Sequence, residues 1–132
     1  MPVIAPYAAI LGLLFIALSV RTILARRRLR IAIGDAGDAT MLRAMRVHSN
    51  FSEYVPICLL LAYFVEISGG RPVLVHVLGS SLVAGRLLHA YGVSRTREVL
   101  VYRQAGMLLT FAVIVLSAGF LLAQFVSGFA RR

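Results

Sequence analysis

Residues 41–56, MLRAMRVHSNFSEYVP, lead directly into the apolar run of residues 57–65. At 3.6 residues per turn, the polar side chains of this stretch recur in steps of three and four and share one helical face: Arg43, Arg46, Asn50 and Glu53. Ionisable groups are costly inside a bilayer, so they usually face a bundle interior or a water-filled cavity and are commonly functional. The stretch therefore predicts a transmembrane helix whose polar face is the main candidate site.

The composition indicates a polytopic membrane protein. Of the 132 residues, 60% are hydrophobic, which is more than a soluble domain of this size needs. The net charge is +9, and all 14 basic residues are arginine, which keeps its charge when it is desolvated. The arginines lie between the apolar runs and form no soluble basic domain, so we do not expect nucleic-acid binding. Cys58 is the only cysteine, and its apolar surroundings indicate a packing residue.

Four apolar segments are long enough to cross a bilayer, which takes about 20 residues. We expect one domain over residues 1–132, an all-α bundle of four transmembrane helices at about residues 3–24, 39–68, 72–92 and 97–128. Glycines in residues 34–38 separate the first helix from the second, and Asp38 or Thr40 can cap the second. Two glycines at 69–70 end that helix, and Pro72 begins the third.

The distribution of arginine predicts the orientation in the membrane. Most arginines lie in or beside the connections after the first and third helices, whereas the other side has only Arg71, Arg131 and Arg132. The positive-inside rule therefore places the two arginine-rich connections in the cytoplasm and both termini outside. The polar face of the second helix then opens toward the cytoplasm.

Several explanations of the polar face remain open at this point. Arg46, Arg86 and Arg103 come near the cytoplasmic ends of helices that must pack together, and Glu53 is the only acid expected among them. Glu53 can form a structural bridge with one arginine, but one carboxylate does not compensate several desolvated guanidinium groups. Water, phospholipid headgroups or a small anionic ligand can supply the remaining negative charge.

The chain offers little conventional catalytic machinery. No cluster of His, Cys, Asp and Glu has metal-ligand spacing, so no metal is expected, and no Ser-His-Asp or Cys-His arrangement can be argued. His76, in the third predicted helix, has no evident polar partner. Catalysis here would depend on arginine and on a nucleophile supplied by a ligand, such as a thiol that a nearby arginine converts to the thiolate.

One motif in the second helix is specific: Arg46-x-His48-x-Asn50-x-x-Glu53-Tyr54-x-Pro56. It follows Ala25-Arg26-Arg27 and a short polar loop, and Arg86-x-x-His89 closes the third helix. Over nearly the whole chain, this pattern resembles the MAPEG superfamily of membrane-associated proteins in eicosanoid and glutathione metabolism. Its members include microsomal glutathione transferases, leukotriene C4 synthase and microsomal prostaglandin E synthase. The chain looks most like the bacterial branch, which implies the inner membrane.

The resemblance implies a homotrimer with glutathione bound between neighbouring subunits near the cytoplasmic face. Position by position, it assigns glutathione contacts to these residues: Arg26, Arg46, His48, Asn50, Glu53, Tyr54 and His89. Arg103 best matches the arginine that activates the thiol. Val93 stands where some members have a second tyrosine, which is a departure from the family pattern.

Residues and resemblance together predict a membrane-embedded, glutathione-dependent transferase or peroxidase, with glutathione as co-substrate. Its substrates would be lipophilic electrophiles or hydroperoxides that arrive from the bilayer. One alternative is a non-catalytic lipid- or thiol-binding membrane protein. Another is a structural trimer whose polar face is a salt-bridge network. The sequence names neither the electrophile nor the physiological thiol.

Overall fold

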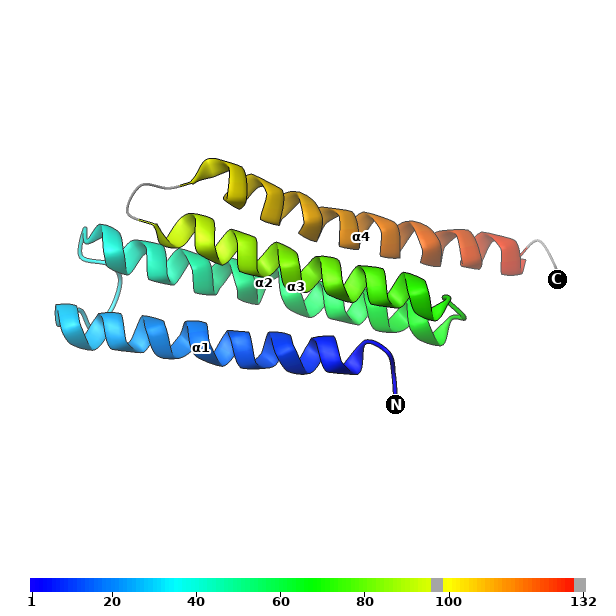
Figure 1. Cartoon of the computed structure of the whole chain (residues 1–132), viewed down its shortest axis with the longest axis horizontal. Helices are drawn as coiled ribbons and strands as arrows, with labels where there is room; N and C mark the ends of the chain where they lie inside the picture. The colour runs from blue at the N-terminus through cyan, green and yellow to red at the C-terminus, as the bar shows by residue number, and fades with distance from the viewer. Residues whose placement is uncertain (96–98, 130–132) are drawn as a thin grey trace.

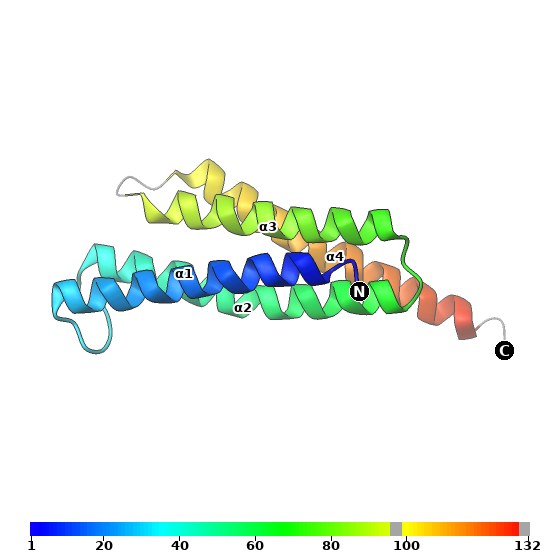
Figure 2. The same ribbon diagram turned by 60° about the horizontal axis from the view of Figure 1, so that its bottom comes forward.

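The computed structural model describes residues 1–95 and 99–129, which contain four long helices: α1 (Ala5–Leu29), α2 (Ala39–Ile67), α3 (Pro72–Ser94) and α4 (Leu100–Phe129). The helices run alternately in opposite directions, so the α1–α2 connection, the end of α3 and the start of α4 lie at one end of the bundle (Figure 1). The N terminus and the α2–α3 connection lie at the other end (Figure 2). Helices α1 and α4 both pack on the central pair, α2 and α3. The predicted all-α bundle of four helices is confirmed.

Helix α1 ends at Leu29, beyond the predicted end at residue 24, and takes in three consecutive arginines at 26–28. Cations in the last turn interact favourably with the negative end of the helix dipole, so the charged segment stays helical. The chain leaves the helix at Arg30, whose backbone is left-handed with φ 57°. The arginines therefore extend α1 instead of forming a loop.

The local signals at the ends of α2 act as predicted. The Asp38 carboxylate accepts hydrogen bonds from the backbone N–H groups of Thr40 and Met41, both at 2.8 Å, and so caps the start of α2. After α2, Gly69 has φ 87°, a left-handed conformation that suits glycine. Pro72 then occupies the first turn of α3, where its missing N–H has little cost.

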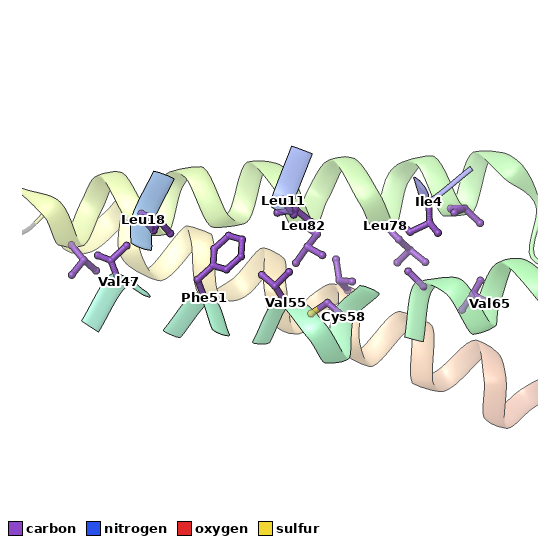
Figure 3. Close-up of a cluster of buried hydrophobic side chains, with 14 residues drawn as sticks. Ile4, Leu11, Leu18, Val47, Phe51, Val55, Cys58, Val65, Leu78 and Leu82 are labelled. Carbon is purple, nitrogen blue, oxygen red and sulfur yellow. The ribbon is translucent and has the colours of Figure 1, made fainter. Parts of the chain in front are cut away.

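A line of buried apolar side chains runs along the bundle between α1, α2 and α3 (Figure 3). Large apolar side chains also cover the outside, including Leu13, Val101, Val115 and Phe125, each more than 60% exposed. All four helices are long and apolar enough to cross a membrane. An apolar core inside an apolar exterior is the pattern of a bundle solvated by lipid.

At the end that holds the N terminus, polar groups are paired within the chain. The Glu66 carboxylate accepts hydrogen bonds from the backbone N–H groups of Val3 (2.5 Å) and Ile4 (3.1 Å), at the start of α1. The Tyr7 hydroxyl lies 2.8 Å from His76 Nδ1. His76 lies one turn into α3 and is exposed. Its polar partner, Tyr7, was not evident from the sequence.

Helices α3 and α4 make the most extensive contact in the bundle, along a seam of glycines. A Cβ atom added to Gly106 would lie 2.5 Å from the carbonyl oxygen of Gly85 and 2.6 Å from the backbone nitrogen of His89. A Cβ atom added to Gly92 would lie 2.7 Å from the backbone nitrogen of Arg103. Small residues allow membrane helices to approach this closely, so the seam sets the distance between α3 and α4.

We expect Gly106→Ala to destabilise the protein by about 1–3 kcal/mol, because the new methyl group overlaps backbone atoms of α3 that cannot rotate away. Gly119→Ala, on the same helix, meets no atom within 4 Å and should leave stability unchanged or raise it by up to ~1 kcal/mol. Thermal unfolding of the two variants in detergent measures the difference. Equal melting temperatures would contradict the proposed role of the seam.

Candidate functional site

A cavity of about 490 Å³ opens between α2, α3 and α4 at the end of the bundle that holds the α1–α2 connection and the start of α4 (Figure 1). This volume lies within the usual range for small-molecule sites. The cavity is lined by Ala39, Leu42, Arg43, Arg46, Ser49, Asn50, Glu53, His89, Val93 and Arg103. No group of three or more His, Cys, Asp and Glu residues that could hold a metal ion occurs within residues 1–95 and 99–129.

Helix α2 supplies the longest wall of the cavity. Arg46, Asn50 and Glu53 follow one another in steps of four and three, so they lie on one helical face. Arg46 and Glu53 are exposed, whereas Asn50 is half-buried. A guanidinium, an amide and a carboxylate therefore lie in a row along the wall, as the sequence predicts.

Helices α3 and α4 supply the opposite wall. His89 is 5% exposed and lies one turn before Val93 on α3. Arg103 is the fourth residue of α4, and the close approach of Gly92 to its backbone holds this turn against α3. Arg43 donates a hydrogen bond of 3.0 Å to the backbone carbonyl of Arg95 and thereby links the start of α2 to the end of α3. Cationic groups thus reach the cavity from α2 and α4.

Two of the predicted site residues, Arg26 and His48, lie outside this cavity. Arg26 donates hydrogen bonds to backbone carbonyl groups of the connection after α1, including that of Gly34 at 3.1 Å. His48 lies on the α1 side of α2, where its Nε2 atom is 3.0 Å from Ser19 Oγ. The ring of His48 also stacks on Phe15, with 5.0 Å between centroids. Within one chain, both side chains have structural contacts with their neighbours.

Tyr54 also lies beside the cavity and does not line it. It is half-buried, and its ring packs against that of Phe111 on α4 with centroids 5.6 Å apart. The structure therefore gathers five of the predicted residues in one cavity: Arg46, Asn50, Glu53, His89 and Arg103. The remaining three, which the resemblance assigned to glutathione, have their contacts elsewhere.

A buried arginine beneath the cavity is the feature that the sequence did not place. Arg86 was expected near the end of its helix among partly desolvated arginines, and the structure buries it almost completely, at 1% exposure. Its Nη1 atom donates to Asn50 Oδ1 at 2.8 Å, and its Nη2 atom donates to Thr110 Oγ1 at 2.6 Å and to the carbonyl of Gly106 at 3.4 Å. Arg86 therefore connects α3 to α2 and α4 through neutral acceptors. The sequence signal that could have indicated this burial is the position of Arg86 directly after Gly85, because a glycine there allows α4 to approach α3 closely.

Comparison with known proteins gives the following similarities. The MAPEG family profile matches residues 4–123. Inner membrane protein YecN of Escherichia coli (strain K12) is 36% identical over 110 residues, which cover 83% of this chain and 82% of that protein. The protein of the same name from Escherichia coli O6:H1 has the same identity and coverage. The matched residues extend from the start of α1 to the last turns of α4.

Ser49→Cys tests whether the cavity is open to water. We expect the introduced thiol to react with a water-soluble maleimide in the folded protein, because Ser49 is exposed in the cavity wall. The native Cys58, which is 0% exposed, should react only after denaturation, so the background is low. Ala44→Cys, at a buried position on the same helix, is the matched control. Equal labelling of positions 44 and 49 would show that the cavity is not open as described.

Proposed function

The chain belongs to the MAPEG family and is an integral inner membrane protein, and from this premise we propose that it is a glutathione-dependent transferase or peroxidase. Its substrates would be lipophilic electrophiles or hydroperoxides. The observation that supports this proposal is the cavity, in which Arg46, Asn50 and Glu53 face Arg103. This combination suits an anionic, peptide-like ligand, because the hydrogen-bond donors can bind its carboxylates and the one carboxylate can bind its ammonium group.

The α2 wall is suited to bind the peptide part of glutathione, which carries two carboxylates and one ammonium group. The Arg46 guanidinium is a fork of donors that matches a carboxylate, and the Asn50 amide adds a further donor. Glu53 is the one acidic group among the described residues that line the cavity, and it would bind the ammonium group. The spacing of these side chains along the helix would hold the ligand in an extended conformation.

Arg103 would act on the sulfur. A guanidinium group next to a bound thiol lowers the thiol pKa from ~8.5, so that the nucleophilic thiolate forms near neutral pH. The thiolate would then attack an electrophilic carbon, form the C–S bond and displace a leaving group with its electron pair. With a hydroperoxide, attack on the O–O bond gives an alcohol and a sulfenic acid, and a second glutathione converts the latter to disulfide and water.

We further propose that the active protein is a homotrimer with its arginine-rich end in the cytoplasm, where glutathione is available. Arg26 and His48 lie on the α1 side of α2, away from the cavity of their own chain. If they contact glutathione, as the resemblance implies, the ligand must lie between two chains. The cavity is open to the surface, and a neighbouring subunit would cover it.

Val93 supports a second candidate function, the non-catalytic binding of a thiol or lipid. Its aliphatic side chain lines the cavity where some relatives have a tyrosine, so this wall lacks a hydroxyl group that could contact a ligand. The name of YecN, the relative from Escherichia coli, describes its membrane location and includes no activity. In this alternative, the same donors retain the ligand, and Arg103 supplies binding energy without turnover.

Glutathione binding to the detergent-purified protein tests the proposal directly. We expect saturable binding in calorimetry, and we expect Glu53→Gln to weaken it at least tenfold, which corresponds to about 1.4 kcal/mol, because the ammonium group loses its partner. Glu66→Gln makes the same substitution on the same helix outside the cavity, and glutathione affinity should be unchanged. The absence of binding at millimolar glutathione would refute the proposal as stated.

Arg103→Ala separates catalysis from binding. We expect the variant to bind glutathione with less than a tenfold loss of affinity, while kcat for conjugation or peroxide reduction falls about 100-fold, as when a transition-state donor is removed. Stopped-flow absorbance at the thiolate band measures the ionised thiol in both proteins. Wild-type binding without turnover on any electrophile or hydroperoxide would favour the non-catalytic candidate.

A further inference from the structure

Arg86 is a buried cation whose hydrogen bond to Asn50 links it to the cavity. It is 1% exposed, and the acceptors of its Nη1 and Nη2 atoms are an amide, a hydroxyl, a carbonyl and a thioether: Asn50, Thr110, Gly106 and Met107. A buried charge held only by neutral groups is costly, and ionisable residues in membrane helices are commonly functional. Asn50 is the one side chain among these partners that also lines the cavity. The hydrogen-bonded contact of Arg86 with the cavity lining is therefore through Asn50.

The chemistry of arginine fixes the orientation of the Asn50 amide. A guanidinium group has donors only, so the atom of the Asn50 amide that faces Arg86 must be the oxygen, Oδ1. The amide nitrogen, Nδ2, then points away from Arg86. In the part of the chain that the structure describes, the buried side-chain polar atoms without a partner are Arg86 Nε and Ser117 Oγ, so Asn50 Nδ2 is not one of them. Nδ2 also has no hydrogen-bond partner among the described residues, and Asn50 lines the cavity, so the donor side of the amide is accessible from the cavity.

We propose that Arg86 is a positioning residue that holds Asn50 with its N–H groups toward the cavity. Position 50 then acts as a donor only and selects a ligand with a carboxylate or carbonyl oxygen at that point. An unrestrained asparagine could rotate by half a turn about its Cβ–Cγ bond and offer either an acceptor or a donor to the cavity. The Arg86 guanidinium also donates to Thr110 on α4, so residues of α2, α3 and α4 together fix the direction of the Asn50 N–H groups.

The positive charge of Arg86 also strengthens the donor that it orients. Charged donors polarise the hydrogen-bonded groups behind them, so a chain of bonds from Arg86 through Asn50 to a ligand oxygen is stronger than isolated bonds. Among the described residues the partners of Arg86 are neutral, so none of their groups is a carboxylate that would cancel this effect. The identity of the ligand, glutathione, rests on the proposed function, whereas the orientation of the amide does not.

A double-mutant cycle of glutathione affinity tests the coupling. Arg86→Lys replaces the planar guanidinium group, which binds both α2 and α4, with a single ammonium group. Glutathione affinity should therefore fall at least fivefold. Asn50→Ala should lower it at least tenfold, and adding Arg86→Lys to this variant should have no further effect. Leu82→Ala removes a buried side chain one turn earlier on α3 and controls for lost stability, with affinity within threefold of wild type. Independent losses that multiply in the double variant would overturn the proposal.

A spectroscopic measurement keeps the proposal testable without glutathione. Asn50 is the only asparagine in the chain, so selective ¹⁵N-asparagine labelling gives one side-chain NH₂ pair in an NMR spectrum. We expect the two NMR signals of this NH₂ group to shift or broaden in the ligand-free Arg86→Lys variant. In the Leu82→Ala variant they should keep their positions. An unchanged pair in Arg86→Lys would overturn the positioning role. A pair that responds to Arg86→Lys in a protein that does not bind glutathione would refute the proposed ligand and support the positioning role.

Asn50→Asp provides a variant that should fold even if Arg86→Lys does not. The carboxylate gives Arg86 an anionic partner, so the melting temperature should be unchanged or higher. The cavity-facing atom becomes an acceptor, and glutathione affinity should fall at least tenfold. A lower melting temperature with retained affinity would mean that Arg86 does not orient Asn50.

Discussion

The hydrogen bonds from Arg86 to Asn50 and Thr110 constrain the arrangement of three of the four helices. Within the hydrocarbon there is no water to replace a lost partner, so a buried guanidinium group fixes the position of whatever it binds. Rotation of α2 would remove Asn50, and a shift of α4 would remove Thr110. The orientation of α2 that pairs Asn50 with Arg86 also places Arg46 and Glu53 in the cavity, because both share a helical face with Asn50. The buried bond thus determines which face of α2 forms the site.

The two ends of the bundle use polar groups in different ways. At the end that holds the N terminus, Glu66 accepts hydrogen bonds from backbone N–H groups at the start of α1, and Tyr7 pairs with His76. These groups satisfy one another, so they explain how the helices are held and leave little for a ligand. At the opposite end, Arg46 and Glu53 are exposed in the wall of an open cavity. The polar groups of the candidate site therefore remain accessible to a ligand.

The sequence predicts what local rules control. The presence of four helices follows from the apolar runs, the start of α2 from the Asp38 cap, and the α2 wall from steps of three and four residues. The same geometry explains why two predicted ligands lie elsewhere: at about 100° per residue, His48 is about 200° from Arg46, and Tyr54 is about 100° from Glu53. The family motif joins these residues in sequence, but one helix cannot present them all to one cavity. The burial of Arg86 depends on the close approach of α4 at Gly85 and Gly106, a tertiary contact that no local pattern predicts.

Charge balance connects the buried arginine to the proposed chemistry. Because Arg86 is held by neutral acceptors, its positive charge adds to that of Arg46 and Arg103 around a cavity in which Glu53 is the one acidic residue among the described lining residues. Glutathione, the proposed ligand, carries one net negative charge as the thiol and two as the thiolate, so this field would favour its binding and would favour its ionised form more. Interactions of this kind are stronger away from bulk water and require no reorganisation when the thiolate reacts. An apolar residue at position 86 would pack at lower cost but would remove both the proposed oriented donor and part of the field that would stabilise the proposed thiolate.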